Sequence, residues 1–203
     1  MTASEVTQAL SGWEERLRGL GAPVAARLRP GLTRAQADAI AAEFEVRLSE
    51  EAAAIWMWHD GDRAAFAERW MEPSLRPFGP FCDLRTSLEK SRELHELLWD
   101  DEENEPELVE VMFRREWVTI IGSQFPLIID CTDPEAPTST TAMFTPDAGI
   151  AQTPHLSIVE RTGWWHWALD HGAWSIAADG SWSVDLDRYP GRLLDLQHKD
   201  VLG

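Results

Sequence analysis

Three histidines and one cysteine are the residues of this sequence best suited to catalysis. His59, His166 and His171 could serve as bases toward the Cys131 thiol or a serine hydroxyl, the pairing that nucleophilic catalysis requires. The patterns that usually accompany such pairs are missing, because the sequence has no GxSxG elbow, no His-Glu-x-x-His pair and no glycine-rich phosphate loop. We therefore expect no catalytic residues and no enzyme activity.

Metal-ligand spacing is missing as well. His166 and His171 lie five residues apart, whereas two imidazoles on one helix face need i, i+4 spacing. Cys82 and Cys131 form no CxxC pair and are too few for a disulfide framework, so we expect reduced, buried thiols. The acidic run after Trp99 lacks the Asp-x-Asp-x-Asp-Gly order of a calcium loop. The sequence thus predicts no metal and no cofactor.

The first half of the chain has the apolar periodicity of helices. A helix over residues 4–20 is predicted by apolar residues that share one face, namely Val6, Leu10, Trp13, Leu17 and Leu20. Thr33 with Gln36, and Thr86 with Glu89, read as capping boxes that begin two further helices, the first ending near Glu45. Three more expectations are a helix with Ser49 as N-cap, an amphipathic piece over residues 63–72, and a short strand over residues 81–84.

Beyond residue 107 the apolar residues alternate with a period of two, which is typical of strands. Alternation predicts strands near residues 109–113, 117–121, 127–129 and 138–144, with a turn at 146–149. They follow each other too closely for crossover helices, which predicts an antiparallel meander. A helix over 156–169 capped by Ser157, a hairpin over 174–184 and a tail over 193–202 complete the chain. The fold class is therefore α+β, a single domain over residues 1–203 with a mainly antiparallel β-sheet flanked by helices.

Charge is the strongest compositional signal. There are 35 acidic against 18 basic residues, a formal charge of -17 and a pI near 4.6. Such a surface repels phosphate, so free nucleic acid is an unsuitable ligand, while a basic protein partner is attracted. No run of about 18 apolar residues and no basic-then-apolar leader is present, so we expect a cytoplasmic protein with no membrane partner.

Four stretches carry a family pattern. GLTRAQADAIAAEFEVRLSEEAAAIWMWHDG, residues 31–61, has a helix entered by Gly-Leu-Thr and a later helix ending in an aromatic residue and Asp-Gly. REWVTIIGSQFPLIIDC, residues 115–131, has two strands around a glycine turn, and 137–149 and 156–172 follow as strand and closing helix. In this order they resemble the SUKH superfamily of bacterial immunity proteins and fungal cell-wall-assembly regulators, although Ser49 and Thr119 replace family prolines. The resemblance covers about residues 31–174; the N-terminal helix and the C-terminal hairpin and tail are expected to pack on that core.

The resemblance implies a protein-binding module that neutralises a cognate toxin, such as a basic nuclease, by occluding its surface. An acidic surface suits that role because nucleases present basic surfaces to phosphates. We expect the partner at a groove bordered by the end of one helix and by two strands, with these candidate residues: Trp58, Asp60, Gly61, Trp117, Asp130 and Asp133. Acidic residues after Trp99 would steer the encounter: Asp100, Asp101, Glu102 and Glu103.

Structural explanations of the same residues stay open. Asp60 and Gly61 are typical of a helix stop, and Asp130 of an Asx turn. The C-terminal tryptophans 164, 165, 167, 174 and 182 fit either core packing or partner contact, and one helix face cannot bury the first three together. Two alternative functions follow: a regulatory scaffold of the same fold without a toxin partner, and a small-molecule-binding protein that uses a tryptophan-rich pocket. The partner's identity and the oligomeric state are not fixed by the sequence.

Overall fold

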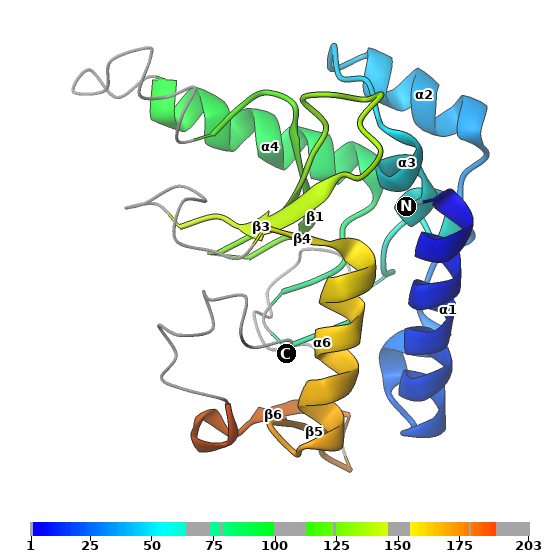
Figure 1. Ribbon diagram of the computed structural model, residues 1–203, viewed down its shortest axis with the longest axis vertical. Helices are drawn as coiled ribbons and strands as arrows, with labels where there is room; N and C mark the ends of the chain where they lie inside the picture. The colour runs from blue at the N-terminus through cyan, green and yellow to red at the C-terminus, as the bar shows by residue number, and fades with distance from the viewer. Residues whose placement is uncertain are drawn as a thin grey trace.

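The computed structural model describes residues 2–63, 74–77, 79–99, 113–123, 125–145, 155–178 and 180–189. In these ranges helices lie on both sides of a four-stranded antiparallel sheet, and a two-stranded hairpin follows the last long helix (Figure 1). This combination of helices and antiparallel sheet has the layout expected for the α+β class. The helices are α1 (Ala3–Gly19), η1 (Pro23–Ala26), α2 (Arg34–Ala42), α3 (Glu50–Trp58), α4 (Leu84–Trp99), α6 (Ile158–Asp170) and η2 (Leu186–Arg188). The strands are β1 (Trp117–Ile121), β2 (Leu127–Asp130), β3 (Thr140–Met143), β4 (Leu156–Ser157), β5 (Trp174–Ile176) and β6 (Trp182–Val184).

Helix α1 confirms the first predicted helix and its buried face. Val6, Leu10, Trp13 and Leu17 are buried against α3 and α6, while Leu20 lies beyond the helix and is exposed. The indole of Trp13 donates a hydrogen bond of 2.8 Å to the carbonyl of residue 75. That bond ties the helix to a loop distant in sequence.

Helices α2 and α3 begin where the capping signals predicted. Thr33 and Gln36 form the expected capping box, and the Ser49 hydroxyl accepts from the Ala52 N–H at 3.1 Å. The α2 helix ends at Ala42, earlier than expected, because Glu45 adopts a φ of 60° that a helix cannot continue. Helix α3 is buried on almost every side, so it runs through the centre of the core.

The predicted start of α4 at Thr86 is wrong. Helix α4 begins at Leu84, and Asp83 takes the capping role, since its carboxylate accepts from the Thr86 N–H at 3.0 Å. The expected strand over 81–84 shrinks for the same reason to a single bridge between Phe81 and Ile121. Asp83, three residues before Thr86, is the better N-cap, because its side chain reaches the free N–H groups of the first turn.

The sheet is the predicted antiparallel meander, in the order β1-β2-β3-β4. Trp117 pairs with Asp130 at one end of β1, and Ile121 pairs with Leu127 near the other, with a bulge between Thr119 and Ile121. The outer side of β1 is covered by the segment before α4, where the Cys82 N–H donates to the Ile120 carbonyl. That contact covers an edge that would otherwise offer free backbone groups.

The two faces of the sheet have separate helical covers (Figure 1). Helix α4 covers one face, where Leu94 and Leu98 pack on a small aromatic cluster of Phe113, Trp117, Ile128, Ala142 and Phe144. Helices α1, α3 and α6 belong to the main core, which includes the opposite face of the sheet. Successive residues of a strand point to opposite faces of the sheet, so alternate residues pack in the two different clusters.

Helix α6 and the hairpin confirm the C-terminal expectations. Ser157 caps α6 in a capping box with Glu160, and Gly172 follows the helix with a φ of 68°. Strands β5 and β6 pair as an antiparallel hairpin. Trp165 is buried against Trp13, with ring centroids 5.6 Å apart.

Several predictions lie wholly or mostly outside the described residues. They are the amphipathic piece over 63–72, the strand over 109–113, the turn at 146–149 and the tail over 193–202. In the described ranges no helix is both long enough and apolar enough to span a membrane.

Candidate functional site

The end of α3 is a structural junction. Trp58 is buried between His59 and Phe81, with ring centroids 4.5 Å and 6.0 Å away. The Asp60 carboxylate accepts a hydrogen bond of 2.9 Å from the Leu84 N–H at the start of α4. Burial raises the pKa of Asp60 more than this hydrogen bond lowers it. Gly61 has a φ of 79° and lies against the backbone of residue 83.

Neighbouring ion pairs fix the same junction. Asp62 accepts two hydrogen bonds from the Arg27 guanidinium, at 3.1 Å and 2.8 Å, and its side chain is almost fully buried. Arg29 pairs with Asp83 at 3.2 Å. These contacts give the Trp58–Asp60–Gly61 candidates clear roles in holding α3, the 27–29 segment and α4 together.

The strand candidates lie elsewhere. Trp117 is 3% exposed and packs edge-to-face on Phe113 at 5.6 Å, so its ring is part of the sheet core. Asp130 accepts from the Thr132 N–H at 2.9 Å, and Asp133 from the Glu135 N–H at 3.0 Å. Both are Asx turns, and for Asp130 this is the structural role that the sequence left open. Asp133 is exposed.

The structure does not bring the two groups of candidates to one groove. Trp117 and Asp130 pair at the first residue of β1, whereas the segment after α3 meets Phe81, which bridges to Ile121 at its last residue. A five-residue strand separates its ends by roughly 13 Å. The remaining candidates, Asp100, Asp101, Glu102 and Glu103, lie outside the described residues.

An open pocket lies instead beside the loop that carries Asp130 and Asp133. It has a volume of about 340 Å³ between α2, the loop from α2 to α3, and the turn after β2. We call it the charged pocket, and it is lined by Arg34, Asp38, Ala42, Val46, Arg47, Leu48, Glu50, Pro134 and Glu135. Three carboxylates and two guanidiniums therefore share one small concave surface.

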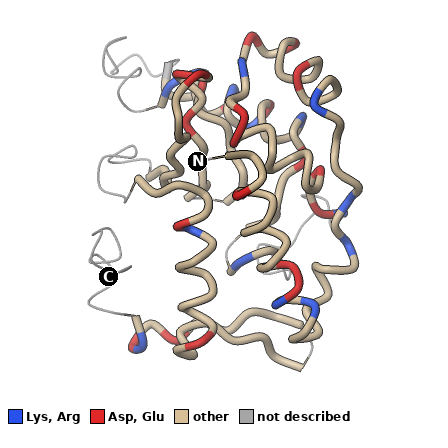
Figure 2. Tube along the Cα trace, turned by 45° about the vertical axis from the view of Figure 1, so that its right-hand side comes forward, with Lys and Arg blue, Asp and Glu red and all other residues tan. Residues whose placement is uncertain are grey.

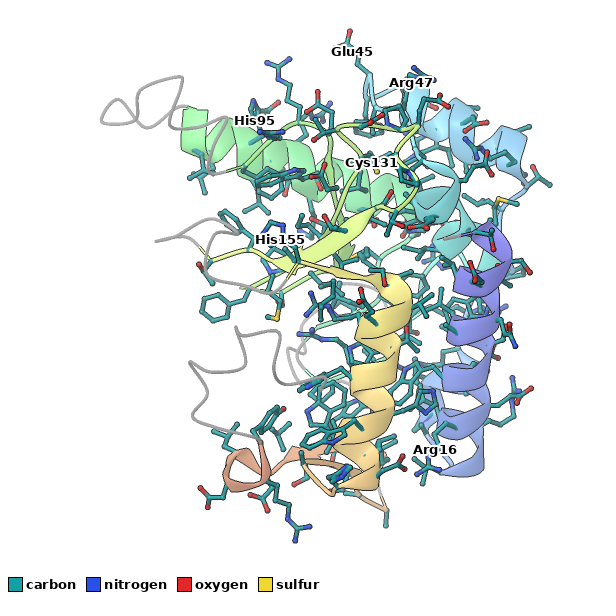
Figure 3. All side chains as sticks on the ribbon, viewed as in Figure 1. Arg16, Glu45, Arg47, His95, Cys131 and His155 are labelled. Carbon is teal, nitrogen blue, oxygen red and sulfur yellow. The ribbon has the colours of Figure 1, made fainter. Side chains whose placement is uncertain are left out.

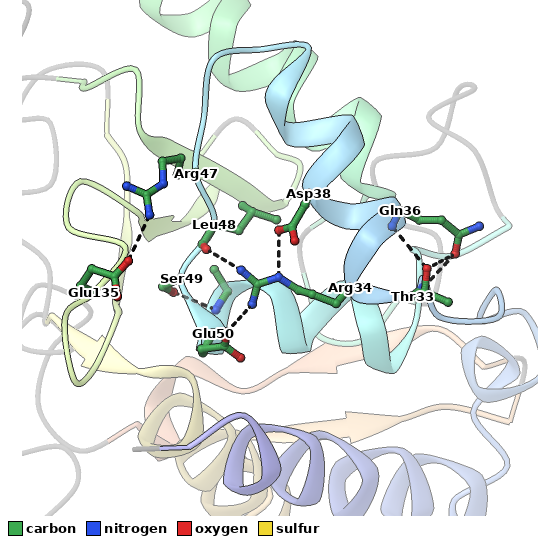
Figure 4. Close-up of polar contacts among 10 residues, drawn as sticks. Thr33, Arg34, Gln36, Asp38, Arg47, Leu48, Ser49, Glu50 and Glu135 are labelled. Atoms are coloured by element: carbon green, nitrogen blue, oxygen red, sulfur yellow. Dashed lines mark hydrogen bonds and ion pairs between the residues drawn. The ribbon is translucent and has the colours of Figure 1, made fainter.

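Arg34 organises one wall of the charged pocket (Figure 4). Its guanidinium donates to Asp38 at 2.8 Å, to Glu50 at 2.7 Å and to the Leu48 carbonyl at 3.2 Å. One cation thus orients two carboxylates and the backbone of the α2–α3 loop. The side chain of Glu50 remains 78% exposed, so its carboxylate is held in place and still faces solvent.

Arg47 links the two walls. It donates to Glu135 at 3.0 Å, and both side chains are largely exposed, at 76% and 81% (Figure 4). Figure 3 shows Arg47 and Glu45 at the outer edge of the α2–α3 loop, with Cys131 farther inside. An exposed pair of this kind contributes little to stability, so a partner can displace it at low cost.

Chemically, the charged pocket is suited to recognition of cationic groups. Its carboxylates are exposed and ordered, and Asp133 and Glu45 add further negative charge next to it. Acidic and basic positions are interspersed over the described chain, so most of it presents mixed charge (Figure 2). The sequence does not predict this site, because Arg34, Arg47 and Glu135 belong to separate segments that only the fold brings together.

The thiols and imidazoles that suggested catalysis each have a separate structural environment. Burial raises the pKa of Cys82 and of Cys131 to about 12, so both are protonated at neutral pH. His59 contacts the Arg29 carbonyl at 2.6 Å, and His171 contacts the Trp167 carbonyl at 2.9 Å. Among the described residues no group of three or more His, Cys, Asp and Glu is placed to hold a metal ion.

The C-terminal tryptophans contact one another and the hairpin. Trp164 packs edge-to-face on Trp174 at 4.9 Å and stacks on Tyr189 at 5.7 Å, and Trp182 stacks near Trp13 at 6.4 Å. The hairpin residue Trp174 thus covers the Trp164 ring, while Trp167 stacks on His171 with ring centroids 4.3 Å apart. Trp165 and Trp174 are buried in the main core, and Trp164, Trp167 and Trp182 are half-buried residues packed against it.

Comparison with known proteins identifies no family for this chain. No family model matches the chain, and no curated protein matches its sequence.

Proposed function

We propose that this chain is a protein-binding module that neutralises a cognate toxin by covering its functional surface. The contact surface centres on the charged pocket and the loop over residues 130–135. One observation carries the proposal: Arg34 and Arg47 pair with exposed carboxylates from three separate chain segments around a concave surface.

Preorganised charge matters because association ordinarily costs side-chain entropy. Glu50 is already oriented by Arg34 before a partner arrives, so less of its conformational freedom is lost on binding. A lysine or arginine of the partner replaces the Arg47–Glu135 pair with a pair across the interface. The partner is therefore a protein with a basic surface.

The charge of the whole chain supports the same partner. A formal charge of -17 raises the rate of encounter with a cationic protein at low ionic strength. A nuclease presents basic side chains to phosphates, so an acidic protein seated there blocks substrate access. No bond is made or broken by the chain's own residues in this mechanism.

The similarity to the SUKH superfamily in the order of four segments supports an immunity role. Its bacterial members neutralise toxins by complex formation, and the predicted meander and capped helices over residues 31–174 are present here. The regulatory-scaffold alternative uses the same kind of surface and differs in its partner. The neighbouring gene separates the two, because an immunity gene lies beside its toxin gene.

Kinetic measurements with charge-reversed variants test the proposed surface. Glu50→Lys and Glu135→Lys each change the charge at the pocket, and Glu15→Lys on α1 makes the same change at an exposed site remote from it. With the product of the adjacent gene as partner, the pocket variants should slow association at least several-fold and flatten its salt dependence. The Glu15 variant should have a much smaller effect.

Equal effects of all three variants would show that only net charge matters and that the pocket is not the contact. A parallel reversal of charge at residues 100–103 tests steering by the acidic run. It should lower the association rate with little change in the dissociation rate.

A further inference from the structure

The Arg34 wall of the charged pocket carries more negative than positive charge. One guanidinium lies between the carboxylates of Asp38 and Glu50, at 2.8 Å and 2.7 Å (Figure 4). Over the whole lining, three carboxylates stand against two guanidiniums, so one formal negative charge is in excess. The Arg47–Glu135 pair is neutral as a pair, which places that excess on the Arg34 wall.

Both carboxylates on this wall keep an oxygen for a further ligand. Asp38 accepts from Arg34 through Oδ1, and Glu50 accepts through Oε1. Within the described part of the chain, Asp38 Oδ2 and Glu50 Oε2 accept no hydrogen bond. The two side chains are 50% and 78% exposed, so a ligand reaches them from solvent. A second cation can therefore bind here without breaking an existing contact.

The rest of the pocket lining is apolar. Ala42, Val46, Leu48 and Pro134 lie beside the charged groups. Lysine and arginine side chains have an aliphatic stem that packs on such a surface while the charged head stays with polar groups. The volume of about 340 Å³ is at the small end of the range for binding pockets, which fits the insertion of a single side chain.

We infer that the charged pocket receives one arginine side chain of the partner protein, with its guanidinium at Asp38 and Glu50 and its stem on the apolar lining. The source of this arginine rests on the proposed function. A guanidinium is favoured over an ammonium because its donors form a planar fork that can bond two carboxylates, and because it is hydrated more weakly. The contact adds to the exchange of the Arg47–Glu135 pair and leaves Arg34 in place.

Titration with small blocked amino acids, followed by NMR, tests the pocket without any partner. N-acetyl-arginine amide should shift the backbone signals of Val46 and Leu48, with a Kd on the order of 1 mM as expected for so small a ligand. N-acetyl-lysine amide should bind at least about three times more weakly. N-acetyl-citrulline amide has nearly the same shape as the arginine probe and no charge, and it should cause no saturable shift.

Two variants locate the bound guanidinium. Glu50→Gln and Asp38→Asn keep the shape of each side chain and remove one charge, so each should raise the Kd of the arginine probe at least about fivefold. Both positions are exposed, so the fold should tolerate either change. Glu15→Gln makes the same change at an exposed site on α1 and should leave this Kd unchanged.

Several results would overturn the inference. The first is the absence of any saturable shift at Val46 and Leu48 with the arginine probe. The others are equal Kd values for the arginine probe and either the lysine or the citrulline probe, and equal Kd values in the unaltered chain and both pocket variants. Much tighter binding of free L-arginine than of the blocked probe would also overturn it, because the pocket would then recognise a free amino acid instead of a side chain.

A measurement with the product of the adjacent gene separates the arginine site from the toxin role. If the arginine probe binds at Asp38 and Glu50 but that product forms no complex with the chain, the arginine site stands and the toxin role is wrong. If the product binds the chain while the arginine probe neither binds the pocket nor competes with the product, the arginine site is wrong and the toxin role stands.

Discussion

The Asp60 carboxylate accepts a hydrogen bond of 2.9 Å from the backbone N–H of Leu84, the first residue of helix α4. Asp83 completes the start of the same helix, because its Oδ1 accepts from the Thr86 N–H at 3.0 Å. Two carboxylates from different segments therefore satisfy the free N–H groups of one helix end. Asp60, two residues after the end of α3, thereby helps to position α4, which covers one face of the sheet.

This contact predicts a difference between two substitutions of Asp60. Asp60→Ala should lower the free energy of unfolding by about 1 kcal/mol, since a helix N–H loses its acceptor. Asp60→Asn keeps an oxygen at that place and should have little effect at pH 7. Urea titration of the three proteins measures the difference, and equal losses for Ala and Asn would contradict the assigned contact.

The pH dependence of the same residue has a definite sign. Burial raises the pKa of Asp60 above its ordinary value of 3.8, so the folded state holds the proton more tightly than the unfolded state. The resulting stabilisation is complete below 3.8 and is lost as the pH rises through the folded-state pKa. The stability of the unaltered chain relative to Asp60→Asn should therefore fall as the pH rises across that interval, as unfolding titrations at a series of pH values would show.

Gly61 is expected to tolerate no side chain. A Cβ there would lie 2.4 Å from the backbone nitrogen of Asp83, and its φ of 79° is already unfavourable for alanine. Gly61→Ala should destabilise the fold by at least about 2 kcal/mol. Gly12→Ala in α1 is the matched control, because a Cβ there meets nothing within 4 Å and should stabilise the helix by about 0.5–1 kcal/mol. A much smaller loss in the free energy of unfolding for Gly61→Ala would mean that the segment after α3 does not pack closely against residue 83 before α4.

Both cysteines should be unreactive in the folded protein. Cys82 and Cys131 are buried thiols whose pKa values lie near 12, so almost no thiolate is present at pH 8. A disulfide reagent should modify them slowly in buffer and rapidly in guanidinium chloride. Fast modification of either thiol without denaturant would place it at the surface.

Much of the fold follows from short-range signals in the sequence. The caps at Thr33, Ser49 and Ser157 depend on a side chain and an N–H three residues away, which the sequence records directly. The meander follows from closely spaced strands. The start of α4 was misplaced because Thr86 and Glu89 imitate a capping box, while the acceptors actually used are Asp83 and, from the preceding segment, Asp60.

The candidate site was less predictable because it depends on tertiary contacts. The sequence predicts Trp58 and Trp117 at the edges of one groove, yet they lie toward opposite ends of β1 and are both buried. The Arg47–Glu135 pair spans 88 residues, and no local pattern predicts a pair at that separation. The Asx turn that the sequence leaves open for Asp130 is present, Asp133 forms a second one, and this loop is next to the charged pocket.

Binding of the purified chain to the product of its neighbouring gene, measured together with that product's toxic activity, tests the proposed function. If the proposed function is right, the two proteins form a stable complex in which the partner loses its toxic activity, and Glu50→Lys and Glu135→Lys inhibit the partner more weakly than Glu15→Lys does. No complex with that product, together with turnover of a substrate by the purified chain itself, would contradict it.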